Sequence, residues 1–161
     1  MILQLILASA LISLVTSDCL YPGDHEQGES CYFFINERKS YWDAQRYCQQ
    51  ARVWSNLAPV DNIIDNNFLT KTAIPELSMN RGDFWIGIYR PEIYDYFRKI
   101  DGRPCTFTNF ADANPSMDFA AISVTRGKWY THAEEEKLPF VCSYYRIVGP
   151  TTTASGDGIR N

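Results

Sequence analysis

Five cysteines, at positions 19, 31, 48, 105 and 142, are the side chains with the most evident chemistry in this 161-residue chain. They can form disulfides if the protein folds in an oxidising compartment. Cys19 and Cys31 enclose a turn-rich stretch and indicate a small stapled hairpin. Cys48 lies on the apolar face of a predicted helix, where a partner from a distant strand could meet it. Because five is odd, at least one cysteine is left for an intermolecular bond, a free thiol or a buried unpaired position.

His132 and the acidic run Glu134-Glu135-Glu136 are a second candidate for chemistry. Calcium takes about 6–8 oxygen ligands, and carboxylates supply them. Adjacent residues point in different directions, however, and acidic runs are usually solvated surface. The sequence therefore favours an exposed acidic loop here over a metal site.

Catalysis and nucleic-acid binding find no support in the sequence. The chain has two histidines and lacks Gly-x-Ser-x-Gly, a phosphate-binding glycine loop and His-Glu-x-x-His, so we expect no enzyme. Its formal charge of −4 argues against a nucleic-acid surface. Arg81-Gly82-Asp83 matches the integrin-recognition tripeptide, but so short a match arises easily by chance and abuts a predicted buried strand.

The ends of the chain differ in composition from its middle. Residues 1–15 are an apolar run followed by small residues, which predicts a secretory signal peptide over residues 1–17. The run is shorter than the ~20 residues that a membrane span needs, which argues against a membrane anchor. It lacks the basic residue that usually begins a signal peptide. We therefore expect a secreted, extracellular protein with one domain over residues 18–146. The Thr, Ser, Gly and Asp content of residues 147–161 predicts a flexible tail.

The pattern of apolar residues predicts a strand over residues 83–89 at the centre of the domain. It is short and apolar on both faces, and Gly87 inside it indicates that another backbone or a bulky ring comes close. Further strands are predicted over residues 31–35, 119–124, 128–131 and 138–145, with residues 36–39 as a polar connection. Pro139 places the start of the last strand at an edge or a bulge.

Two helices are predicted before the central strand. The first spans residues 40–50, with Ser40 and Asp43 at its start forming a box-like cap and an apolar face of Tyr41, Ala44, Tyr47 and Cys48. The second spans residues 61–72 and ends before Pro75. Its apolar stripe is predicted to comprise Ile63, Ile64, Asn67, Phe68 and Leu69.

Taken in order, these features resemble the C-type lectin-like domain family over about residues 19–145. The motifs that carry the resemblance are Cys31-Tyr32-Phe33, Trp42-x-Ala44-x-x-x-Cys48, Trp85-Ile86-Gly87-Ile88, Asp101-Gly102, Asn109-Phe110, Asn114-Pro115, Trp129 and Phe140-Val141-Cys142. The resemblance implies an α+β fold, with two helices flanking mainly antiparallel sheets, a long ligand-binding loop region and disulfide staples. It also implies that Cys48 pairs with Cys142 and Cys19 with Cys31. Cys105 is then the candidate for an intermolecular bond or a free thiol, with a buried unpaired cysteine as an equal alternative.

The long loop departs from the family pattern. Members that bind sugar through calcium carry Glu-Pro-Asn or Gln-Pro-Asp where this chain has Asn114-Pro115-Ser116. The family's Trp-Asn-Asp corresponds to Trp129-Tyr130-Thr131, and Asp118 could replace a separate glutamate. The family's second disulfide is also missing, with Phe119 at one cysteine position. These departures predict that the chain binds no metal or other cofactor, calcium included. The resemblance implies that Trp129 is a core residue.

The expected function is non-catalytic recognition of an extracellular glycan, protein or lipid surface without calcium, with host defence as one setting. The expected contact residues are Asn114, Ser116, Asp118 and Thr131. Two alternatives stay open: a calcium-dependent lectin with a degenerate site, and a structural or inhibitory subunit in a covalent dimer through Cys105. The Asn114–Pro115 bond, commonly cis in the family, could be cis or trans here.

Overall fold

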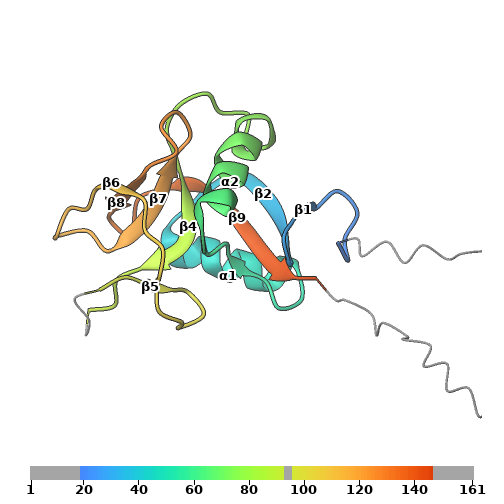
Figure 1. Ribbon diagram of the computed structural model, residues 1–161, viewed down its shortest axis with the longest axis horizontal. Helices are drawn as coiled ribbons and strands as arrows, with labels where there is room; N and C mark the ends of the chain where they lie inside the picture. Colours follow the sequence, from blue (N-terminus) through green and yellow to red (C-terminus); the bar gives the residue numbers. More distant parts are fainter. Residues whose placement is uncertain (1–18, 93–95, 147–161) are drawn as a thin grey trace, which may run out of the picture.

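The structure is a computed structural model that describes residues 19–92 and 96–146, and a single sheet runs through this part of the chain (Figure 1). The predicted signal peptide and tail lie outside the described residues. The strand order is β1-β2-β9-β4-β7-β8-β6, with β3 beside β9 and β5 beside β4. The strand bounds are β1 His25–Gln27, β2 Ser30–Lys39, β3 Asn56–Leu57, β4 Asp83–Tyr89, β5 Arg98–Lys99, β6 Phe110–Asp112, β7 Phe119–Ser123, β8 Trp129–His132 and β9 Leu138–Tyr145.

Strand β4 is the central strand that the sequence predicts. It pairs with β9 in parallel, with Trp85 opposite Phe140, and with β7 antiparallel. Phe84, Ile86 and Ile88 pack in one buried cluster with residues of α2, whereas Trp85 packs in another with residues of α1. Both faces of the strand are covered, which explains why its apolar residues are consecutive and do not alternate with polar ones.

Gly87 is required because the backbone of the next layer comes very close. A Cβ atom at this position would lie 2.2 Å from the carbonyl oxygen of Leu57. The Gly87 amide also donates a hydrogen bond to the carbonyl of Ala58 at 2.7 Å, which holds the two segments together. The predicted close approach is therefore confirmed, and its partner is the chain around β3.

Strand β2 is longer than predicted, because residues 36–39 continue it and do not form a connection. Ile35 pairs with Phe140 and Lys39 with Leu138, so residues 36–38 lie opposite Pro139 alone. This irregularity is the predicted bulge, and it accommodates a proline that lacks an amide donor. The alternative of an edge position is wrong, since β9 lies between β2 and β4.

Helix α1, Tyr41–Ala51, starts where predicted but without the predicted cap. The Ser40 hydroxyl donates to the Asp43 carboxylate at 2.8 Å and makes no bond to the helix backbone. The buried face comprises Tyr41, Ala44, Gln45 and Cys48, with Tyr47 only partly buried. Gln45 is buried because its amide oxygen accepts the Leu57 amide at 2.8 Å, which fixes α1 against β3.

Helix α2, Ile63–Glu76, extends past the predicted end and includes Pro75 in its last turn, where a missing amide costs a single helical bond. The predicted apolar stripe is largely wrong: Ile63 and Ile64 are 50% and 63% exposed. The buried side chains are Asn66, Leu69 and Ala73.

A buried amide links α2 to β8. The Asn66 Oδ1 atom accepts a hydrogen bond from the indole Nε1 of Trp129 at 2.7 Å, and its Nδ2 donates to the carbonyl of Gly127 at 2.9 Å. Trp129 is fully buried, so the prediction that it is a core residue is confirmed. The polar partner on α2 explains why a buried indole N–H is tolerated there.

Candidate ligand-binding loop

The candidate site is the loop of residues 113–118 between β6 and β7. Strand β8 lies between these two strands, pairing with β6 in parallel and with β7 antiparallel. The loop therefore crosses the end of β8 and passes beside Thr131. The loop lies at the end of the sheet formed by β7, β8 and β6 (Figure 1).

Three of the four predicted contact residues, Asn114 and Ser116 of the loop and Thr131 of β8, are linked by hydrogen bonds. The Asn114 amide donates to the Thr131 hydroxyl at 2.8 Å, and the Asn114 side-chain oxygen accepts the Ser116 amide at 2.9 Å. Thr131 is buried, while Asn114 and Ser116 are exposed. The described part of the chain contains no cis peptide bond, so the Asn114–Pro115 bond is trans.

The fourth predicted residue, Asp118, is bound by an arginine that the sequence did not single out. Arg90 Nε donates to Asp118 Oδ1 at 2.8 Å, and the Arg90 amide donates to the Asp118 carbonyl at 2.8 Å. Its Nη2 donates to the carbonyls of Pro115 at 2.7 Å and Met117 at 3.3 Å. One guanidinium thus holds the second half of the loop from the inside.

These residues do not fit a calcium ion. Asn114 Oδ1 and Thr131 Oγ1 already accept backbone hydrogen bonds, and Asp118 is paired with Arg90. The remaining oxygens are neutral, whereas a tight calcium site takes several carboxylates. The Arg90 guanidinium, which is bound to this loop, would also repel a divalent cation.

Arg90 was missed because it directly follows β4 and nothing near it in the sequence indicates its partner. The contact arises from strand register: Tyr89 pairs with Phe119, so the residues next to them, Arg90 and Asp118, lie face to face. The two are 28 positions apart in the chain. Only a correct prediction that these two strands pair in this register could have identified the partner.

The acidic run after β8 is exposed, as predicted, but His132 has two carboxylate partners. Its Nε2 lies 3.0 Å from Asp83 and its Nδ1 lies 2.8 Å from Glu136. Burial lowers the pKa of His132, but the hydrogen bonds to Asp83 and Glu136 outweigh it, and the net shift is upward. Among the described residues there is no group of three His, Cys, Asp or Glu side chains that could hold a metal.

The Arg-Gly-Asp tripeptide is divided between two environments. Arg81 and Gly82 are exposed, but Asp83 begins β4 and faces His132. Since an engaged aspartate is not presented to a partner, the tripeptide is better explained as the entry to the central strand.

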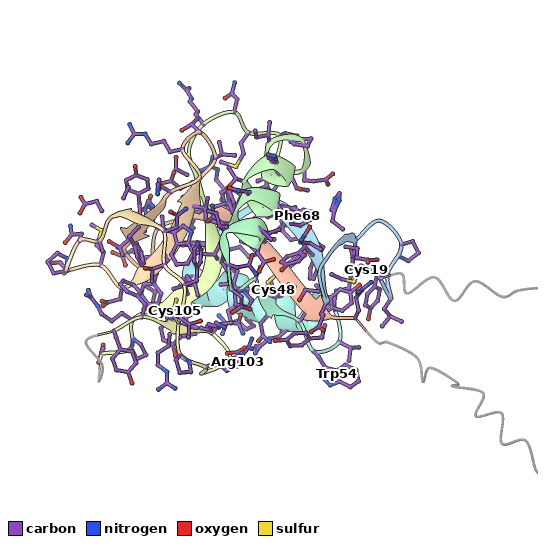
Figure 2. The ribbon with its side chains drawn as sticks, in the orientation of Figure 1. Cys19, Cys48, Trp54, Phe68, Arg103 and Cys105 are labelled. Atoms are coloured by element: carbon purple, nitrogen blue, oxygen red, sulfur yellow. A yellow bond between two sulfur atoms is a disulfide. The ribbon has the colours of Figure 1, made fainter. Side chains whose placement is uncertain are left out.

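The structure contains both implied disulfides, Cys19–Cys31 and Cys48–Cys142. Cys48 and Cys142 are fully buried and join α1 to β9. Cys105 is unpaired in the described chain and half-buried, and its Sγ donates to the Phe107 carbonyl at 3.0 Å (Figure 2). Burial raises the pKa of this thiol.

Comparison with known proteins agrees with this architecture. The chain matches the family model described as Lectin C-type domain over residues 37–144. A lectin from Pleurodeles waltl is 30% identical over 138 residues, covering 79% of this chain and 76% of the relative. A snaclec chain from Philodryas olfersii is 25% identical over 132 residues, covering 78% and 81%. The crystal structure of human lithostathine superposes with a TM-score of 0.71 at 23% identity, covering 86% of this chain and 99% of that one, a likeness of fold alone.

Proposed function

Since the chain belongs to the lectin C-type domain family, we propose that it is a secreted, non-catalytic module that recognises an extracellular glycan, protein or lipid surface without calcium. A binding role is supported by relatives that are named as a lectin and as a snaclec. Secretion is supported by the apolar run at residues 1–15 and by the two disulfides, which need an oxidising compartment. No helix in residues 19–92 and 96–146 has the length and apolarity needed to cross a membrane.

The observation that carries the proposal is the Arg90 guanidinium bound to the candidate loop. It binds Asp118, the single carboxylate among the predicted contact residues, and two backbone carbonyls. The positively charged Arg90 side chain, through its bonds to Asp118 and to two backbone carbonyls, therefore holds the loop in shape. A glycan is the first ligand to test, because the relative from Pleurodeles waltl is named as a lectin.

Calorimetric titration with millimolar calcium tests the independence from metal. We expect no heat of binding from the native protein, and the same result from the Asp118→Asn variant, which lacks the loop carboxylate. Mannose and galactose columns, run with and without chelator, should show no difference. A calcium signal that disappears in Asp118→Asn, or retention that chelator abolishes, contradicts the proposal.

A further inference from the structure

An open hollow at the end of β2 is lined mainly by positively charged side chains, although the chain as a whole is acidic. The cations in its lining are Arg38, Lys39, Arg46 and Lys137. Asp43 is the one carboxylate among the residues that line it, and the acidic run of residues 134–136 contributes none. In a chain with a formal charge of −4, such a concentration of positive charge needs an explanation.

The bulge in β2 brings two of these cations to the same hollow. Neighbouring residues of a regular strand point to opposite faces, yet Arg38 and Lys39 both line this hollow. The alternation is interrupted because residues 36–38 lie opposite Pro139 alone. Pairing resumes between Lys39 and Leu138, which places Lys137, the residue before β9, beside the start of α1. Residues of β2 and α1 and the residue before β9 therefore converge on the hollow.

Two of the four cations are already paired with carboxylates. Lys39 Nζ lies 2.8 Å from the Glu37 carboxylate, and its ammonium also lies 5.3 Å from the centre of the Tyr47 ring. Arg46 forms an ion pair with Asp43. The negative charge of Asp43 is therefore neutralised inside the hollow and does not oppose an anionic ligand.

Arg38 and Lys137 are the two cations without a carboxylate partner. Among the described residues neither side chain makes an ion pair or a hydrogen bond, and both are exposed. Their two positive charges match the charge of about −2 that a phosphate monoester carries near neutral pH. A guanidinium offers a planar set of donors that fits phosphate oxygens, and an ammonium adds a point charge.

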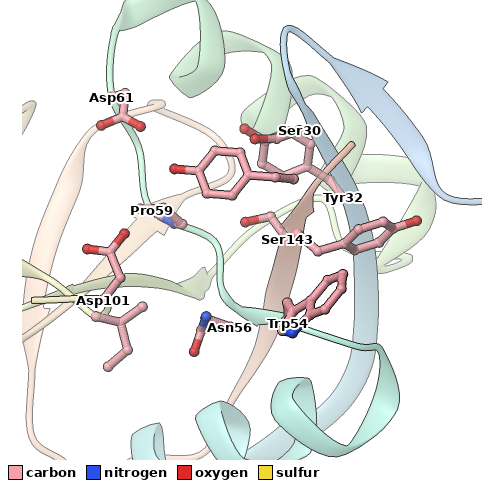
Figure 3. Close-up of a pocket in the computed structure, with 11 residues that line it drawn as sticks. Ser30, Tyr32, Trp54, Asn56, Pro59, Asp61, Asp101 and Ser143 are labelled. Atoms are coloured by element: carbon pink, nitrogen blue, oxygen red, sulfur yellow. The ribbon is translucent and has the colours of Figure 1, made fainter. Parts of the chain in front are cut away.

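The size of the hollow also fits such a group. Its volume is about 380 Å³, and it opens beside the first turn of α1, where the helix dipole favours an anion. The pocket between β2, β3 and β9, shown in Figure 3, has a volume of about 40 Å³, which leaves room for no more than a few water molecules. Of these two depressions, the hollow at the end of β2 is the one with room for an anion.

We propose that this hollow binds a dianionic phosphate group, either in solution or at the head of a phospholipid. Arg38 and Lys137 contact the phosphate oxygens, and Lys39 and Arg46 add positive charge at the rim. The site shares no residue with loop 113–118, so it is separate from the recognition surface proposed above.

Sedimentation with phosphatidylcholine vesicles in EDTA tests the lipid source. We expect the native protein to bind vesicles that contain phosphatidic acid more tightly than phosphatidylglycerol vesicles of the same surface charge, because phosphatidylglycerol carries a singly charged diester. Arg38→Gln/Lys137→Gln should bind phosphatidic acid roughly tenfold more weakly or worse, since each cation near an anionic surface contributes about fivefold.

Lys71→Gln/Arg81→Gln is the matched control. Both residues are exposed, make no ion pair in the described chain and lie outside the hollow, so this variant loses the same charge elsewhere. It should bind like the native protein. Both double variants replace exposed side chains and should melt close to the native temperature, which separates a loss of binding from a loss of fold.

Titration with inorganic phosphate, followed by the amide signals in NMR spectra, tests the soluble source. Shifts centred on residues 38–40 and 137 without vesicle binding assign the site to phosphate in solution, and vesicle binding as well assigns it to the lipid headgroup. Equal weakening in the two double variants, or unchanged binding by Arg38→Gln/Lys137→Gln, overturns the site. Equal binding to both anionic lipids overturns the dianionic phosphate, and neither shifts nor vesicle binding overturns the whole proposal while leaving calcium-independent recognition intact.

Discussion

Removal of the Cys48–Cys142 disulfide should destabilise the protein more than removal of Cys19–Cys31, by an amount that follows from the chain separations. The first bond closes a separation of 94 residues and the second one of 12. In the chain-entropy relation these loops correspond to about 4.7 and about 2.8 kcal/mol at 25 °C. The double variants Cys48→Ala/Cys142→Ala and Cys19→Ala/Cys31→Ala should therefore differ by roughly 2 kcal/mol in their free energy of unfolding.

Urea unfolding followed by far-ultraviolet circular dichroism measures this difference without depending on the tryptophans. Both members of the longer bond are fully buried, so the volume lost on substitution by alanine acts in the same direction as the entropy. Equal losses of stability in the two double variants, or a larger loss for Cys19→Ala/Cys31→Ala, would refute the reasoning. The slopes of the two unfolding curves need to agree, because a changed slope would report a changed unfolded state.

Three further outcomes are expected. Gly87→Ala should lose about 3 kcal/mol of stability or more in the same urea assay, because its Cβ would lie 2.2 Å from a backbone oxygen. The hydrogen bonds of His132 to Asp83 and Glu136 raise its pKa, so protonated His132 should stabilise the fold. This contribution should be full below the unfolded pKa of about 6.5 and be lost as pH rises through the folded value. Urea unfolding of the native protein and of His132→Gln at pH 5.5 and 8 checks this, and an equal response of both proteins to pH would refute it. Cys105 should react slowly with a thiol reagent at neutral pH, since it is half-buried and its pKa is raised. A non-reducing gel should show monomer, and a disulfide-linked dimer on that gel would contradict this.

The strands were the most predictable part of the fold, because their signals are local. The bounds predicted for the last strand, residues 138–145, are those of β9, and the predicted 83–89 are those of β4. Runs of β-branched and aromatic residues between turn residues define these segments without reference to a partner. The close approach at Gly87 could also be anticipated, since glycine inside such a run needs a reason.

The buried face of α2 was not predictable in the same way. Ile63 and Ile64 are more apolar than Asn66, yet they are exposed while Asn66 is buried. The choice depends on which residue meets the Trp129 indole, and that indole comes from a strand more than sixty positions further along the chain. Composition alone cannot select a polar residue for the core when its partner is so remote.

The sequence by itself predicted the central strands from their local runs of apolar residues. Through its resemblance to a family it also predicted the disulfide pairing and a long loop that lacks the family's calcium-binding motifs. The tertiary structure alone decided which side chain holds the candidate loop. Arg90 meets Asp118 because β4 and β7 pair in one register. Such contacts join positions far apart in the chain, and their free energy depends on the packing of every element between them.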